Sequence, residues 1–254
     1  MSIVLNEVKQ AEHIIEKGEV GNKPTSTLFL LGKYYRINLD KKQTFSKMNE
    51  FMENNYKNYN SALWEDIIED ISKKANKYSL RELNCIGVTQ QELDKISDIA
   101  NLKYQKLLFT MLCYAKLYNC ISENNNNWIN ADIKEIFRVA RVSVKYRNDK
   151  FLYLNDLEKT GLISFSNKND NLNIRVNFIE MDGEHVFNVG DFRELGYEYL
   201  NYIGNGEFIR CTECERLIKK TNNKCLYCIK CAKEKKNIQN KKYYKEKFRK
   251  IENA

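Results

Sequence analysis

The chain has 254 residues, of which 43% are hydrophobic, and it carries a formal net charge of +8. This length is enough for one large domain or two to three small ones, with sufficient apolar residues for a core. A single proline, Pro24, and few glycines argue against an all-β sandwich or a linker-rich protein, and we find no transmembrane run. Because residues 1–7 have neither a basic start nor a long apolar stretch, we expect no signal peptide and a cytoplasmic protein.

The positive charge is concentrated at the C-terminal end. Residues 210–252 contain fifteen Lys/Arg and five Asp/Glu, a balance of +10, whereas the rest has twenty-seven against twenty-nine, a balance of −2. Such a polarity predicts contact with a polyanion near the C-terminus.

The first hundred residues read as a helical region, 1–100. Apolar residues at helical spacing predict helices over 6–17, 27–37, 44–54, 61–77 and 89–99. In the last of these, Thr89 is followed three residues later by Glu92, the spacing of a capping box. We interpret the aromatic residues of this region as core and not as a base-stacking platform.

The region 101–205 has the element order of a winged helix-turn-helix. We predict helices over 102–118, 132–142 and 146–160, then strands over 162–166 and 173–179. The third helix would bury Phe151, Leu154 and Leu157 and end at a left-handed Gly161. A further strand over 185–189 and a helix over 192–203, capped by Asp191, complete the region. The stretch 154–163 resembles the end of recognition helices in the winged-helix superfamily.

If this interpretation is right, the third helix enters the major groove of DNA and the hairpin reaches phosphate or minor groove. The contacts expected from the helix and the hairpin are Lys145, Arg147, Asn148, Lys150, Lys168 and Arg175. The alternative is that these are ordinary solvated charges on a structural module, since many winged helices bind protein instead.

Two Cys-x-x-Cys pairs, Cys211/Cys214 and Cys228/Cys231, have the spacing of a zinc ribbon, in which four thiolates surround one Zn²⁺. With all four positions filled by sulfur, such a Zn²⁺ is structural and does not catalyse. Cys225 leaves an alternative open, because Cys225 and Cys228 also form a Cys-x-x-Cys pair; we prefer Cys228/Cys231. A disulfide cluster is disfavoured in a reducing cytosol.

The region 206–254 continues beyond the cysteines as a basic helix over 232–250, with interleaved aromatic residues. We expect Lys241, Lys242 and Lys245 to contact phosphates, which would give salt-dependent binding without sequence specificity. The alternative is a solvated tail that keeps the protein soluble.

The sequence therefore predicts a mainly α protein with a small β component. We see no Gly-rich phosphate loop, metal-spaced carboxylate cluster or nucleophile–base signature, so we expect no enzymatic activity. The first hypothesis is a DNA-binding protein that acts in transcription regulation or replication. The alternative is an adaptor that docks on a polymerase or replisome component.

The arrangement resembles a group of poorly characterised phage and prophage proteins of low-GC Gram-positive bacteria. This resemblance covers most of the chain and implies a mobile-element origin and the cytoplasm of a bacterial host. It is carried by the ribbon, 208–232, and by four other segments, 23–25, 31–35, 64–66 and 191–200. The additional Cys225 departs from the pattern expected for the group.

Overall fold

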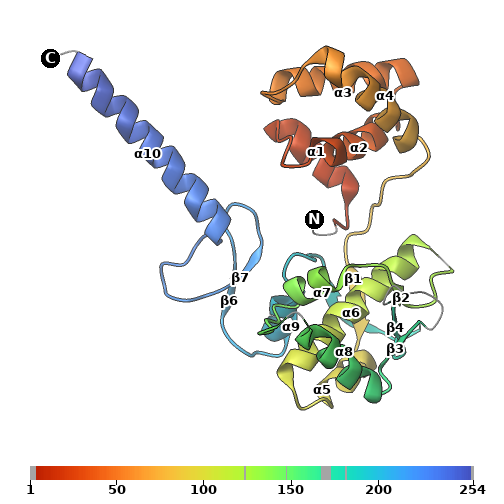
Figure 1. Ribbon diagram of the computed structural model, residues 1–254. Helices are drawn as coiled ribbons and strands as arrows, with labels where there is room; N and C mark the ends of the chain where they lie inside the picture. Colours follow the sequence, from red (N-terminus) through yellow and green to blue (C-terminus); the bar gives the residue numbers. More distant parts are fainter. Residues whose placement is uncertain (1–3, 123, 147, 167–172, 181, 253–254) are drawn as a thin grey trace. The chain divides into compact units, whose positions relative to one another are not determined.

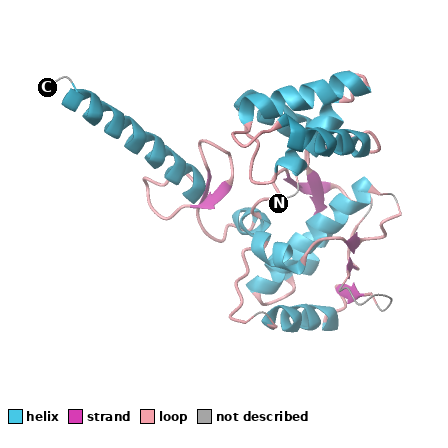
Figure 2. Cartoon of the chain, turned by 45° about the horizontal axis from the view of Figure 1, so that its top comes forward, coloured by secondary structure: helices cyan, strands magenta, loops and turns pink. Residues whose placement is uncertain are grey.

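The computed structural model describes residues 4–122, 124–146, 148–166, 173–180 and 182–252, and it is mainly helical with small sheets (Figure 1). Coloured by secondary structure, it shows strands only as short segments among the helices (Figure 2). Two compact units make up the chain, Ile3–Cys85 and Ile86–Ala254. They are described separately below.

The first unit is built from four helices. They are α1 (Glu7–Lys17), α2 (Pro24–Tyr35), α3 (Lys41–Asn55) and α4 (Ser61–Ala75). Side-chain caps start three of them, because Asn6, Asp40 and Asn60 each accept a hydrogen bond from a first-turn backbone N–H. The core between the helices is mainly apolar and includes Leu28, Leu31, Met48, Met52 and Ile68.

A mostly buried carboxylate, that of Glu7, connects three segments of this unit. Glu7, in the first turn of α1, accepts hydrogen bonds from the ammonium of Lys33 in α2 and from the backbone N–H and guanidinium of Arg81. Burial raises the pKa of Glu7, but these hydrogen bonds outweigh it and hold the pKa below its ordinary value. Three segments of the unit therefore meet at one charge.

The second unit begins with β1 (Ile86–Thr89), which pairs antiparallel with β5 (His185–Val189). The strand leads into α5 (Gln90–Ser97), so this helix, which we assigned to the region 1–100, belongs to the second unit. The capping box predicted at its start is confirmed, with Thr89 and Glu92 exchanging backbone-to-side-chain hydrogen bonds of 2.9 and 3.3 Å.

Glu92 also connects the start of α5 to two other parts of the unit. Its side chain is fully buried, and it accepts hydrogen bonds from Lys116 Nζ at 2.7 Å and from the backbone N–H of Glu180 at 2.9 Å. Lys116 lies in α6 (Leu102–Ile121), the long apolar helix at the centre of the unit. Because its carboxylate is buried and paired with Lys116, Glu92 has a structural role.

A three-stranded sheet follows α6. Its strands are β2 (Trp128–Ile129), β3 (Ile163–Phe165) and β4 (Ile174–Val176), in the order β2-β4-β3. Between β2 and β3 the chain forms α7 (Ile133–Val139) and α8 (Asp149–Lys159). The predicted hairpin strands are thus present in shorter form, and β2 was not predicted because two residues carry no periodicity.

The structure corrects two details of this region. Leu154 and Leu157 are buried as predicted, but Phe151 is 45% exposed. Each three-residue step rotates the helix face by about 60°, so Phe151 has turned away from the face that the two leucines bury. The last helix of the region, α9 (Leu195–Tyr202), begins after Glu194, and the predicted cap Asp191 binds Arg193 instead.

The chain ends with a hairpin and a long helix. The hairpin strands are β6 (Phe208–Arg210) and β7 (Leu217–Lys219), paired antiparallel with Ile209 opposite Ile218. The helix is α10 (Ile229–Glu252), which includes the predicted basic stretch.

Candidate metal centre

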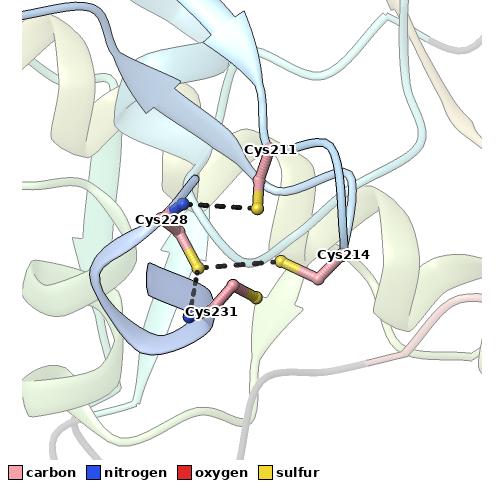
Figure 3. A group of neighbouring side chains, drawn as sticks. All are labelled: Cys211, Cys214, Cys228 and Cys231. Carbon is pink, nitrogen blue, oxygen red and sulfur yellow. Dashed lines mark hydrogen bonds between the residues drawn. The ribbon is translucent and has the colours of Figure 1, made fainter. Parts of the chain in front are cut away.

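The first Cys-x-x-Cys pair lies in the turn of the β6–β7 hairpin, and the second lies where the following loop meets α10. Cys211 directly follows β6 and Cys214 lies in the turn before β7, whereas Cys228 precedes α10 and Cys231 lies in its first turn. The four side chains converge (Figure 3). Segments fourteen or more residues apart in the chain therefore bring their sulfur atoms to one place.

The spacing of the sulfur atoms suits a tetrahedral metal site. All four Sγ atoms lie within 4.8 Å of one another, and Cys214 Sγ is 3.8 Å from Cys228 Sγ. Four sulfurs bound to zinc at about 2.3 Å would be about 3.8 Å apart. Three of the cysteines are buried and Cys214 is half-buried, which limits the access of water. These residues could hold a metal ion.

Backbone N–H groups point at the sulfur atoms, as thiolate ligands require. Cys211 Sγ accepts from the N–H of Cys228 at 3.3 Å, and also from the N–H groups of Glu213 and Cys214. Burial raises the pKa of Cys211, but these hydrogen bonds outweigh it and lower the pKa to about 6. For Cys231, burial and the neighbouring thiols raise the pKa. Thiolates so close together repel one another, and a divalent cation bound between them would offset this repulsion and stabilise all four.

The pairing preferred from the sequence agrees with this geometry. The group consists of Cys211, Cys214, Cys228 and Cys231, and Cys225 lies outside it. Cys113 is buried in the apolar helix α6, where burial raises the pKa of its thiol. It is a residue of the apolar core.

Sequence reasoning missed the acids that contact the first Cys-x-x-Cys pair. Asp191, Glu194 and Glu198 form ion pairs with Arg210 and Arg216, which flank that pair on either side. Only Glu198 lies within α9, and Asp191 and Glu194 precede it, so no helical spacing in the sequence marks the three acids as one group.

Each predicted DNA contact of the winged-helix-like part that the structure describes has its own local surroundings. Lys145 lies over the ring of Tyr146 and Lys150 over the ring of Phe137, and Asn148 is exposed just before α8. Arg175, in β4, donates to the carbonyl of Asn126 at 3.2 Å. Arg147 and Lys168 lie outside the described residues. Within α8 itself three acids outnumber two lysines.

The helix α10 has the strongest local charge. Residues 229–252 contain ten Lys/Arg and three Glu. Lys241 and Lys242 are exposed, and neither forms an ion pair with a carboxylate in the part of the chain that the structure describes. Tyr243 and Tyr244 beside them are also exposed. Lys245 belongs to the same helix, but its side chain lies outside the described residues.

Within the described ranges, no helix is both long and apolar enough to cross a membrane. No protein-family model matches the chain, and comparisons with curated proteins and with solved structures found no match either.

Proposed function

We propose that the protein binds DNA through α10 and that its four cysteines hold a structural Zn²⁺. The observation that carries the proposal is the balance of ten cations against three acids on one exposed helix. Lysines that neutralise phosphates release counterions, and this gives affinity without sequence specificity. Exposed tyrosines next to the lysines add faces on which bases or sugars can pack.

Zinc is the metal that suits the site. Four sulfur ligands in a group of this size favour Zn²⁺ over Mg²⁺ or Ca²⁺, which prefer oxygen. Four cysteines leave no open position for substrate, so the ion would stabilise the fold of a short segment with few apolar residues. We accordingly assign the protein no enzymatic role.

The element order supports a winged helix for 102–179. In a winged helix, a short strand follows the first of three helices and a β-hairpin, the wing, follows the third. The chain has this order, α6-β2-α7-α8-β3-β4, and its sheet has the strand order β2-β4-β3. In this reading α8 is the recognition helix. Because its own charge is slightly negative, we expect α8 to contribute less to affinity than α10. A role in transcription regulation or replication of a mobile element fits both parts.

The test uses two matched lysine pairs. Lys241→Glu with Lys242→Glu removes two phosphate contacts from α10, and Lys41→Glu with Lys42→Glu makes the same change at an exposed Lys-Lys pair in α3. Binding to fluorescent duplex DNA is measured by anisotropy over a salt series. We expect the α10 variant to bind more weakly and to lose about two units of salt slope. No binding by the wild type at low salt, or equal losses in both variants, would refute the proposal.

A second candidate function rests on a different observation. Tyr146, Phe151 and Leu152, in and just before α8, are each at least 45% exposed. Exposed apolar groups on a recognition helix favour a protein partner, such as a polymerase or replisome component. Phe151→Ser with Leu152→Ser should then abolish co-purification of that partner and leave DNA affinity unchanged. Loss of DNA affinity in this variant would instead place DNA at α8.

A further inference from the structure

Two arginines flank the first Cys-x-x-Cys pair, and both reach acids of the segment 191–198. Arg210 directly precedes Cys211, and its guanidinium lies 2.8 Å from a Glu198 oxygen and 3.7 Å from Asp191. Arg216 follows Cys214 by two residues and lies 3.4 Å from Glu194. The hairpin that carries the pair is therefore bound on both sides to the α9 segment.

These contacts differ from surface ion pairs because the acids are buried. The side chains of Glu194 and Glu198 are only 1% and 6% exposed. A buried carboxylate is costly without a nearby cation, so Glu198 in particular favours the docked hairpin, which brings Arg210 to it. Arg141, just after α7, also binds Glu194 and shares its Oε1 atom with Arg216. Arg193 binds Asp191 through its guanidinium, at 2.8 Å.

Arg216 connects the acids to the ligands themselves. Its carbonyl accepts a hydrogen bond from the N–H of Cys211 at 2.9 Å. The residue whose side chain binds Glu194 thus also fixes the turn between the first two sulfurs. Outer-shell partners of this kind orient metal ligands and tune metal affinity.

Within the described residues, the second Cys-x-x-Cys pair has no flanking ion pair to the segment 191–198. Cys228 precedes α10, and Ile229 beside it is 91% exposed. The ion pair that holds the start of α10 joins Lys235 to Glu213 at 2.5 Å, within the ribbon. Among the described residues, no ion pair links 222–252 to the segment 191–198. The two halves of the metal site are therefore unequal.

We propose that the first pair, Cys211 and Cys214, is a preformed half-site held by the α9 segment, and that metal binding attaches the second pair and α10 to it. Arg210 and Arg216 are then positioning residues of the metal centre. A ligand half-site that is already ordered lowers the entropy cost of binding, so docking and metal affinity must strengthen each other. This inference does not depend on what α10 binds.

The first test compares two double variants of the full-length protein. Arg210→Gln with Arg216→Gln removes the docking cations, and Lys219→Gln with Lys224→Gln removes two exposed ribbon cations that make no described ion pair. Zn²⁺ affinity is measured by competition with a chromophoric chelator. We expect about a tenfold or greater loss for the arginine variant and little change for the lysine variant, with Arg→Lys replacements recovering most of the loss. Equal affinities of the two double variants would overturn the proposal.

The second test needs no substitution and so does not depend on the folding of a variant. Hydrogen exchange of the wild-type protein is compared with and without Zn²⁺. We expect the backbone amides of 208–219 to keep most of their protection in the metal-free protein, and the first turns of α10 to lose theirs. Equal loss of protection in both segments would show that the half-site is not preformed.

Discussion

The buried ion pair between Glu92 and Lys116 gives the sharpest test of what holds the second unit together. We consider Glu92→Gln, which keeps the shape of the side chain and removes its charge. Glu92 is fully buried and accepts three hydrogen bonds, from Thr89 N–H, Glu180 N–H and Lys116 Nζ. The amide can accept through one oxygen only, so at least one donor is left without an acceptor.

The expected cost follows from these contacts. Removal of one partner from a buried ion pair costs about 3–5 kcal/mol, and an orphaned buried N–H alone costs about 1–3 kcal/mol. Lys116 keeps the carbonyl of Gly87 at 2.7 Å as a partner, which limits the loss. Since the two effects share one side chain and do not add, we expect about 3–5 kcal/mol of destabilisation in the free energy of unfolding.

The assay exploits the two tryptophans, because Trp64 lies in the first unit and Trp128 in the second. In a Trp64→Phe background, urea unfolding followed by Trp128 fluorescence reports on the second unit. The control is Glu207→Gln, which breaks an ion pair whose carboxylate is 76% exposed, and it should cost less than about 1 kcal/mol. A loss below about 1 kcal/mol for Glu92→Gln would refute the reasoning.

Three further predictions concern the metal site, acid stability and helix packing. Cys231→Ser should remove bound zinc and Cys225→Ser should retain it, as measured by atomic absorption of the purified protein; the reverse result would move the ligand set. The pKa of Glu7 is lowered from 4.5, so its stabilisation is present above that pH and is lost as the pH falls through the folded-state pKa. Acid unfolding of the first unit, followed by circular dichroism, should therefore become less pH-dependent in Glu7→Gln. Gly196→Ala should destabilise the second unit by about 1–3 kcal/mol or more in thermal melts, because the new Cβ would lie 2.0 Å from the carbonyl oxygen of Ala140. A melting temperature equal to that of the wild type would show that α9 can shift without cost.

Local signals accounted for most of what the sequence could predict. The capping box at Thr89 and Glu92 involves residues three apart, and both Cys-x-x-Cys pairs are readable from spacing alone. The long apolar helix α6 was also evident, because its buried residues form a continuous run. In each case the interaction that fixes the structure lies within a few residues of chain.

The features that were missed depend on distant partners. The strand β1 forms because it pairs with β5, with Ile86 opposite Val189. Its four residues show no alternation of apolar and polar side chains that would predict a strand. Likewise Phe151 lies at the edge of the buried face of α8, and whether that edge is covered depends on tertiary neighbours. The anchoring acids of the metal site became meaningful only when Arg216 was placed beside Glu194.

The shared carboxylate of Glu194 has a practical consequence for anyone who wishes to express parts of this protein. A fragment that stops at residue 205, where the composition changes, would leave Glu194 with Arg141 but without Arg216, and Glu198 without Arg210. The buried carboxylate of Glu198 would then lack its cation, and α9 would be destabilised. The useful truncation point therefore lies inside α10, beyond Lys235, and a shorter fragment should aggregate or melt early.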